Sequence, residues 1–390
     1  MKAEDLQGIK TPFYYYNTEL LKATLSSISE HAGKFGFHVH YALKANCNDR
    51  LLGIIKDNGM GADCVSGNEV KKALETGFSK NKIVFAGVGK TDEEILLGLQ
   101  NDIFCFNCES LQELEVINEL AQREGKKAKV AVRINPNVNA NTHKYITTGL
   151  EENKFGISST QLGLVLELLK HLPAVELVGL HFHIGSQITD LSSFKSLCVR
   201  VNEIQNWFEQ RNVSFSHINV GGGLGIDYYH PEESPMADFE NYFALFHQFI
   251  ELRPGQELHF ELGRAVVAQC GSLITKALFI KHGLKTDFVI VDAGMTELIR
   301  PALYQSYHKI ENISKQHLSP NSYYDVAGPI CESSDYFGKR VFMPETERGD
   351  LLAIRSAGAY GEVMSSRYNL REQAGSVYSD EVKSGKMIKM

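Results

Sequence analysis

The segment His217-Ile-Asn-Val-Gly-Gly-Gly-Leu-Gly225 joins a short apolar run to a glycine-rich loop. The apolar run is typical of a buried parallel strand, and glycines directly after a strand let backbone N–H groups approach an anion closely. Barrel enzymes built from alternating strands and helices commonly bind phosphate at the loops after their seventh and eighth strands. The loop lacks the third glycine and the later acidic residue of a dinucleotide-binding fingerprint. A tight turn without a ligand is the alternative interpretation.

Other apolar runs surround this segment, and stretches with helical spacing lie between them. The eight predicted strands are His38–Ala45, Gly61–Ser66, Ile83–Gly87, Ile103–Asn107, Lys129–Asn135, Leu177–Gly185, His217–Gly223 and Leu258–Gly263. The apolar spacing predicts helices at Glu93–Leu99, Glu109–Glu124, Gln161–His171 and Phe194–Arg211. Strands and helices in this number and order predict a (β/α)8 TIM barrel, although an open doubly wound sheet would use the same alternation.

The pattern changes near residue 265, after which strand-like runs are divided by turn residues. These runs are Val266–Ile280, Phe288–Asp292, Tyr323–Ala327 and Asp350–Ser356. They predict a β-domain, to which the early run Pro12–Tyr16 could add a strand. The predicted division is residues 25–265 for the barrel, with residues 1–24 and 266–390 for the β-domain.

Composition excludes several classes of protein. The chain has 40 basic and 47 acidic residues, a net charge of -7, which argues against a nucleic-acid-binding surface. Its apolar runs are too short for a membrane span, and its acidic N-terminus lacks the apolar region of a signal peptide. Scattered cysteines indicate reduced thiols, and Cys105 with Cys108 lacks the second pair that a zinc site needs. We therefore expect a cytoplasmic protein without a metal, a membrane or a nucleic acid as partner.

Polar residues collect where the predicted barrel strands end, which is where this fold carries its catalytic residues. They are Lys44, Asp63, Ser66, Arg133, His181, His183, Glu261 and Arg264. Lys44 lies in an apolar setting, where an ammonium group is costly. Such lysines can act as nucleophiles that form Schiff bases. A surface lysine is the alternative interpretation of this residue taken alone.

Nine motifs in a fixed order extend this pattern over nearly the whole chain, from Thr11-Pro12-Phe13 onward. They are Tyr41-Ala-Leu-Lys44-Ala-Asn46, Thr142-His-Lys-Tyr-Ile-Thr-Thr-Gly149, Asn153-Lys-Phe-Gly156, His181-Phe-His183-Ile-Gly-Ser186-Gln187, Gly221–Gly225, Glu261-Leu-Gly-Arg264, Arg300-Pro-Ala-Leu-Tyr304, Gly328-Pro-Ile-Cys331-Glu332-Ser333 and Gly358-Ala-Tyr360-Gly361. With them the chain resembles the fold-type III pyridoxal-phosphate (PLP) decarboxylases, the family that acts on ornithine, diaminopimelate and arginine. Leu262 stands where that family usually has proline, a change that removes no functional group. The resemblance implies an alanine-racemase-like barrel with a C-terminal β-barrel domain.

The resemblance also implies how PLP is held. Lys44 would carry it as a Schiff base, His183 would stack on its ring, and Glu261 would pair with the ring nitrogen. The other implied cofactor-binding residues are Asp63, Ser66, Arg133, Ser186, Gly221, Gly222, Gly223, Gly225, Gly263, Arg264 and Tyr360. An ionised carboxylate keeps the ring nitrogen protonated, which favours decarboxylation over racemisation because the ring can then accept electrons.

The implied substrate is meso-2,6-diaminopimelate, which would give L-lysine and CO2 in the last step of lysine biosynthesis. Its distal end would be bound by Arg264, Arg300, Tyr304, Glu332 and Tyr360. Arginine suits the distal carboxylate, because its guanidinium group can form two parallel hydrogen bonds. Cys331 would donate a proton and would come from the partner subunit of a homodimer with shared sites. The alternatives are a related substrate such as carboxynorspermidine, and a PLP-binding barrel protein without catalytic activity.

Overall fold

The computed structural model describes residues 2–138 and 154–384, and the chain divides into two units. The barrel unit consists of Leu25–Gly225 and Asp238–Gly263. The β-unit consists of Met1–Thr24, Ile226–Ala237 and Arg264–Met390. The short segment Ile226–Ala237 lies within the range predicted for the barrel, but it belongs to the β-unit, where Tyr228 accepts hydrogen bonds from Arg264 and Arg300.

Eight parallel strands of the barrel unit form a closed ring. In order around the ring they are β2 (His38–Ala42), β3 (Gly61–Cys64), β4 (Ile83–Phe85), β5 (Cys105–Cys108), β6 (Ala128–Asn135), β8 (Val175–His181), β9 (His217–Asn219) and β10 (Glu257–Leu262). Pairing of β5 with β6 and of β10 with β2 closes it, while the short β7 (Ile157–Ser158) pairs with β6 outside the ring. The predicted barrel and each of its predicted strands are confirmed, and the open sheet is excluded.

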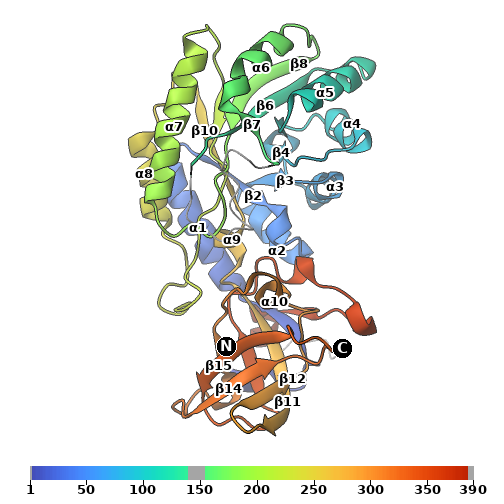
Figure 1. The fold of residues 1–390 in the computed structure, drawn as a ribbon, viewed down its shortest axis with the longest axis vertical. Helices are drawn as coiled ribbons and strands as arrows, with labels where there is room; N and C mark the ends of the chain where they lie inside the picture. The colour runs from blue at the N-terminus through green and yellow to red at the C-terminus, as the bar shows by residue number, and fades with distance from the viewer. Residues whose placement is uncertain (1, 139–153, 385–390) are drawn as a thin grey trace. The chain divides into compact units, whose positions relative to one another are not determined.

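Helices connect these strands and lie outside them (Figure 1). They are α1 (Thr18–Gly33), α2 (Asp49–Asp57), α3 (Gly67–Thr76), α4 (Asp92–Gln100), α5 (Leu111–Arg123), α6 (Leu162–Leu169), α7 (Ser192–Glu209) and α8 (Phe239–Phe249). Side-chain caps explain several of the starting points, since Ser66 and Ser110 each accept a hydrogen bond from a backbone N–H in the first turn. Thr91 and Glu94 form a capping box at the start of α4.

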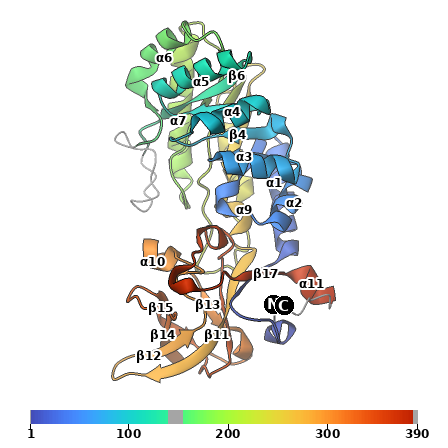
Figure 2. The same cartoon turned by 90° about the vertical axis from the view of Figure 1, so that its right-hand side faces the viewer.

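Both ends of the chain contribute to the sheet of the β-unit, in which β11, β12, β14 and β15 lie side by side (Figure 2). The strands are β1 (Phe13–Tyr16), β11 (Gly271–His282), β12 (Asp287–Val291), β13 (Ile310–Asn312), β14 (Ser322–Ala327), β15 (Tyr336–Met343), β16 (Leu351–Ile354) and β17 (Gly375–Tyr378). The early strand β1 pairs antiparallel with β11 and parallel with β17, as its predicted addition to the β-domain requires. The short helices α10 (Arg300–Tyr304) and α11 (Ser379–Ser384) complete the unit.

One predicted strand of the β-unit begins differently from the expectation. The run Val266–Ile280 was expected to be extended throughout, but its first residues belong to the short helix α9 (Arg264–Val267), and β11 starts only at Gly271. All four residues of α9 are buried, so the apolar character that suggested a strand reflects burial of a helical turn.

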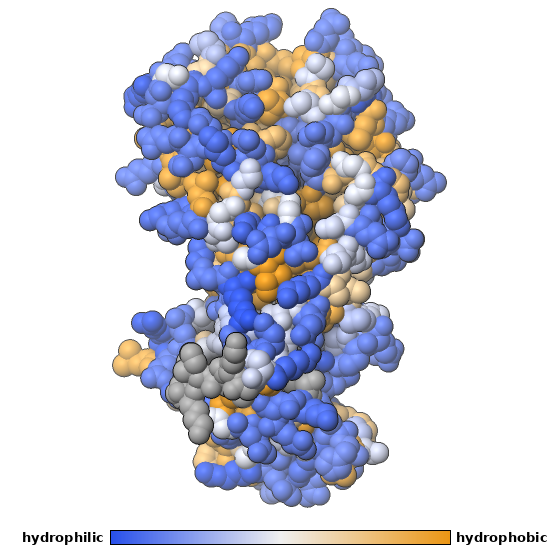
Figure 3. Space-filling model, turned by 180° about the vertical axis from the view of Figure 1, so that it is seen from behind, coloured by the Kyte–Doolittle hydropathy of each residue, from blue (hydrophilic) through white to orange (hydrophobic). Residues whose placement is uncertain are grey.

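Among the described residues, every helix is too short or too polar to cross a membrane. On the face drawn in Figure 3, hydrophilic residues predominate and hydrophobic ones occur in small groups among them.

The outer face of β10 packs on α8 through an aromatic cluster. The ring of Phe260, which is fully buried, lies 5.0 Å from those of Phe243 and Phe246 and 5.6 Å from that of Tyr242, measured between centroids. The pairs are edge-on, the arrangement that aromatic quadrupoles favour.

We expect Phe260→Ala to lower the free energy of unfolding by about 3–5 kcal/mol, because it leaves a cavity in this cluster. Urea unfolding followed by far-UV circular dichroism measures the loss. Phe279→Ala is the matched control, since Phe279 is 56% exposed and its truncation should change stability little. Equal stabilities for the two variants would contradict the packing role given to Phe260.

Candidate active site

The carboxyl ends of the barrel strands bring polar side chains from different parts of the sequence together. Lys44 was predicted to lie in the strand His38–Ala45, but β2 ends at Ala42 and Lys44 belongs to the 3-10 turn Leu43–Ala45 that follows it. Asp63 lies in β3, Glu261 lies in β10, and His181 and Asn219 are the last residues of β8 and β9. Because all the strands are parallel, these residues share one end of the ring.

Glu261 is the centre of a buried hydrogen-bond network. Its Oε1 accepts hydrogen bonds from the side-chain amides of Asn107, at 3.0 Å, and Asn219, at 2.8 Å. Its Oε2 lies 3.0 Å from Nε2 of His181. Burial alone would raise the pKa of Glu261, but His181 and then Lys44 outweigh it, and the net shift of the pKa is strongly downward. The carboxylate therefore stays ionised at neutral pH.

Lys44 and Asp63 form the second element of this cluster. The Lys44 ammonium donates to Oδ2 of Asp63 at 2.6 Å; the Asp63 side chain is fully buried, whereas that of Lys44 is 40% exposed. Burial and then the charge of Glu261 raise the pKa of Asp63, and Lys44 offsets part of that shift. The other oxygen of Asp63 is buried without a hydrogen-bond partner in the described part of the chain. This carboxyl group therefore orients the lysine amine and retains capacity to accept another hydrogen bond.

The glycine loop after β9 is packed closely against the barrel. Gly221 and Gly223 have positive φ angles of 69° and 108°, and a Cβ atom on Gly222 would overlap the carbonyl oxygen of Glu261. The amide of Gly221 donates to the side chain of Asn219 and that of Gly225 to a backbone carbonyl. Phosphate binding by the loop stays a prediction, and in this structure the Gly221 and Gly225 amides already have protein acceptors.

His183 lies beside this loop with a neutral ring. Its Nδ1 accepts a hydrogen bond from the amide of Gly222 at 3.2 Å. Burial, reinforced by the charges of Arg133 and Lys44, lowers the pKa of His183 to about 3. A neutral imidazole has an uncharged face, which suits the predicted stacking on an aromatic cofactor ring.

Arg133 and Ser66 make local contacts within the barrel unit. Arg133 forms a buried ion pair with Glu109 at 2.6 Å, and the second oxygen of Glu109 accepts from the amide of Gly156. Ser66 caps α3. The predicted motif at residues 142–149, and Asn153 of the next motif, lie outside the described residues.

The barrel cluster fits PLP. A lysine amine, a carboxylate that stays ionised and a neutral histidine lie at one end of the ring, together with a buried carboxylate oxygen of Asp63 that has spare acceptor capacity. This is the donor set that a pyridine ring with an aldehyde needs for covalent attachment, protonation of its nitrogen and stacking.

A second cluster, within the β-unit, contains two buried arginines that share one phenol. Arg264 donates to the Tyr228 hydroxyl oxygen at 2.6 Å and Arg300 to the same oxygen at 2.8 Å. Burial alone would raise the pKa of Tyr228, but the two guanidinium groups lower it overall. Among the described residues no carboxylate lies within ion-pair distance of Arg300, whose pKa is lowered by burial and by the charge of Arg264. A buried cation of this kind favours an anionic ligand.

Neighbouring side chains orient the arginines. Nδ1 of His308 lies 2.9 Å from the Arg355 carbonyl, so it carries the proton and Nε2 can accept from Arg300 at 3.2 Å. The Tyr360 ring lies 5.0 Å from the Arg264 guanidinium carbon, and Tyr360 has a positive φ of 56°, which is strained for a tyrosine.

The remaining predicted residues of the β-unit lie on its surface or close to it. Tyr304 is the last residue of α10 and is half-buried. Cys331 and Glu332 are exposed on the loop between β14 and β15, where Glu332 accepts from the Tyr368 hydroxyl at 2.9 Å. Ser186 and Gly263 follow β8 and β10 in the barrel unit.

Sequence reasoning missed several residues of both clusters. Asn107 is the next-to-last residue of β5 and Asn219 the last of β9, and asparagine at such positions is usually taken for a turn residue. Their position near the carboxyl ends of barrel strands, where this fold carries its catalytic residues, could have identified them. Tyr228 and His308 had no such signal, because they lie in irregular segments between elements.

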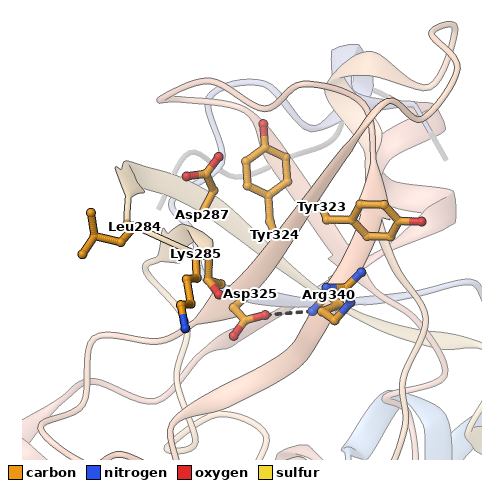
Figure 4. A pocket seen from close by; sticks show the side chains of 9 residues that line it. Leu284, Lys285, Asp287, Tyr323, Tyr324, Asp325 and Arg340 are labelled. Carbon is orange, nitrogen blue, oxygen red and sulfur yellow. Dashed lines mark hydrogen bonds between the residues drawn. The ribbon is translucent and has the colours of Figure 1, made fainter.

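A pocket of about 310 Å3 in the β-unit is distinct from these clusters (Figure 4). Its lining residues are Gly283, Leu284, Lys285, Thr286, Asp287, Tyr323, Tyr324, Asp325 and Arg340. No predicted site residue is among them.

Comparisons with known proteins agree with this chemistry. Residues 21–268 match the family described as pyridoxal-dependent decarboxylase, pyridoxal binding domain. The diaminopimelate decarboxylase of Bacteroides thetaiotaomicron is 58% identical over 380 residues, which are 97% of this chain and 98% of that protein. The enzyme of the same name from Vibrio cholerae is 40% identical and covers 95% of this chain and 88% of its own.

A crystal structure of diaminopimelate decarboxylase from Helicobacter pylori complexed with L-lysine superposes with a TM-score of 0.90 at 39% identity, covering 96% of this chain and 93% of that one. Similarity of this extent runs through both units and is well above the level at which only the fold is shared. The chain therefore belongs to the pyridoxal-dependent decarboxylases and, within them, to the diaminopimelate decarboxylase family.

Proposed function

We propose that this protein decarboxylates meso-2,6-diaminopimelate to L-lysine and CO2 with PLP as its cofactor, the last step of lysine biosynthesis. The observation that carries the choice of substrate is the buried arginine pair on Tyr228, because Arg300 has no carboxylate partner among the described residues. A substrate with a distal carboxylate would supply that charge. A substrate without a carboxylate at its far end, such as lysine or ornithine held with its single carboxylate at the cofactor, would leave the cation unpaired and react poorly.

The barrel cluster is proposed to carry out the chemistry. When bound, PLP supplies the electron sink that accepts the electron pair released when CO2 departs. Lys44 is the residue proposed to hold the cofactor covalently, and Asp63 orients its amine. Glu261 stays ionised in its network, so it can hold a proton on the cofactor's ring nitrogen. His183 is neutral and can cover the face of the ring.

The ends of the substrate have separate proposed partners. Arg264, Arg300 and Tyr304 would bind the distal carboxylate, with Tyr360 beside Arg264, and Glu332 would bind the distal ammonium. Charge-assisted pairs of this type give both affinity and orientation. The same residues would discriminate against carboxynorspermidine and other diamino acids of different length.

Cys331 is proposed to protonate the carbon from which CO2 has left, because a thiol is a workable acid near neutral pH. Cys331 and Glu332 are both exposed, which leaves them accessible to a second chain. We therefore propose a symmetric homodimer in which each chain supplies these residues to the site of its partner.

Lys44→Ala should abolish turnover and the covalent attachment of PLP, because the only amine assigned to that bond is removed. Borohydride reduction followed by peptide mass spectrometry should place the cofactor on the Lys44 peptide in the wild-type protein and find no such adduct in the variant. Lys80→Ala, at an exposed lysine, is the control and should keep both properties. A labelled peptide elsewhere in the chain would identify a different lysine.

Arg300→Ala should raise KM for diaminopimelate and lower kcat/KM at least about tenfold, the loss of one charge-assisted pair of roughly 1.5–3 kcal/mol. CO2 release from diaminopimelate, L-lysine, L-ornithine and carboxynorspermidine should be measured for both proteins. Activity on substrates without the distal carboxylate should be nearly unaffected, so the preference for diaminopimelate falls. Arg348→Ala, in the same unit, should leave the preference unchanged, and the same result for Arg300→Ala would remove Arg300 from substrate recognition.

Subunit exchange tests the shared site. Homodimers of Lys44→Ala and of Cys331→Ala should each be nearly inactive, because every site lacks one residue. After mixing, about half of the dimers are heterodimers with one intact site of two, so activity should recover to about a quarter of the wild-type value. Mass spectrometry under non-denaturing conditions verifies the exchange. Activity that stays at the parental level after exchange would place Cys331 and Lys44 of one site in the same chain.

A further inference from the structure

The end of the barrel opposite the lysine and glutamate cluster carries three side chains with metal-binding atoms. His38 is the first residue of β2, while Glu257 and His259 are the first and third residues of β10. The two strands pair in parallel with His259 opposite His38, and the two imidazole rings stack at 4.9 Å. Strand geometry puts Glu257 and Glu261 about 13 Å apart along β10, so this group is separate from the active-site network.

A chain of hydrogen bonds fixes the proton positions of the buried histidines. Nδ1 of His40 lies 3.0 Å from the Lys82 carbonyl oxygen, which can only accept, so that nitrogen carries the proton. Nε2 of a neutral His40 is then an acceptor, and it lies 2.9 Å from Nδ1 of His259. His259 must donate there.

This chain of bonds leaves Nε2 of His259 as a bare lone pair. That atom is buried and has no hydrogen-bond partner among the described residues, and the side chain as a whole is only 4% exposed. It faces Oε2 of Glu257 at 3.5 Å. A lone pair and a carboxylate oxygen repel each other at this distance unless a positively charged species lies between them.

His38 supplies a third ligand atom from the solvent side. Its Nε2 lies 3.7 Å from the same Oε2 of Glu257, and the three ligand atoms all lie within 4.8 Å of one another. Zinc bonds of about 2.0–2.2 Å in a tetrahedron put ligand atoms roughly 3.4 Å apart, close to the two separations that involve Glu257. The side chains of His38 and Glu257 are exposed and can shift, which would shorten the third separation, between the ligand nitrogens of His38 and His259.

We infer that His38, Glu257 and His259 bind a divalent transition-metal ion, with Zn2+ as the preferred ion, at the amino-terminal end of the barrel. Two imidazoles and one carboxylate are ligands that suit zinc, whereas calcium and magnesium prefer oxygen alone. Water completes the coordination. His40 orients His259 through its second nitrogen, as partners of metal-bound histidines commonly do. The ion would join β2 to β10 and stabilise the barrel without taking part in the reaction.

Titration of the chelator-treated, PLP-loaded protein with ZnCl2 tests this site. Equilibrium dialysis with elemental analysis gives the stoichiometry, and thermal scanning gives the shift in Tm. His38→Ala and Glu257→Gln change exposed side chains, so both variants should fold. Each should weaken zinc binding at least about tenfold and abolish the rise in Tm, while kcat stays at the wild-type value. His171→Ala is the matched control: His171 is exposed just beyond the end of α6 and faces Glu167 at 3.8 Å, and no third ligand completes this pair among the described residues.

Cobalt substitution separates this site from the exposed thiols Cys47 and Cys331, which can also bind zinc. Cobalt on two histidines and a carboxylate should give visible absorption without the near-ultraviolet band of a thiolate ligand, and this absorption should disappear in His38→Ala. The inference would be overturned if the wild-type protein takes up no stoichiometric zinc. It would equally be overturned if zinc binding and Tm respond alike in the wild type, His38→Ala and Glu257→Gln, or if the cobalt spectrum shows only thiolate ligands.

Discussion

A carboxylate stays ionised inside a protein only when hydrogen bonds and opposite charge replace the water that it loses, and Glu261 depends on this compensation. Its partners Asn107, His181 and Asn219 come from β5, β8 and β9. β5 lies directly opposite β10 in the order of the ring. A shift of one residue in any of these strands would turn its side chain away from the interior. The closed ring and its register are therefore conditions for the charge on which the proposed chemistry depends.

The same constraint gives the glycine loop a structural role. The loop leaves β9 immediately beyond Asn219, and the Gly221 amide helps to orient that asparagine. Gly222 lies so close to the backbone of Glu261 that any side chain there would displace the strand. Glycine is thus required for packing around the buried carboxylate, in addition to any contact that the loop makes with a phosphate. The sequence pattern alone suggested only the second reason.

The barrel could be predicted because its strands are buried on both faces and appear as continuous apolar runs. The lysine and the glutamate could be predicted because they interrupt such runs at one end. Residues whose role depends on partners far away in the sequence could not be predicted. Tyr228 matters because two arginines donate hydrogen bonds to its hydroxyl group, and the residues next to it in the sequence do not indicate this. Short strands such as β13 and β17 were missed for a similar reason, since their pairing partners lie far away in the sequence. The helical turn α9 was mistaken for a strand because burial and extended structure give the same apolar signal.

The β-unit is assembled from three separate stretches of chain, and the middle one, Ile226–Ala237, is an excursion between β9 and α8. This segment contains Tyr228, whose hydroxyl oxygen accepts hydrogen bonds from both Arg264 and Arg300. Recombination between related genes that exchanged only the carboxyl-terminal part would therefore combine arginines from one parent with the tyrosine of the other. The β-unit is inherited as a functional whole only if all three stretches come from the same parent gene. Over evolutionary time this connectivity would keep the two units of the chain in one gene and couple their divergence.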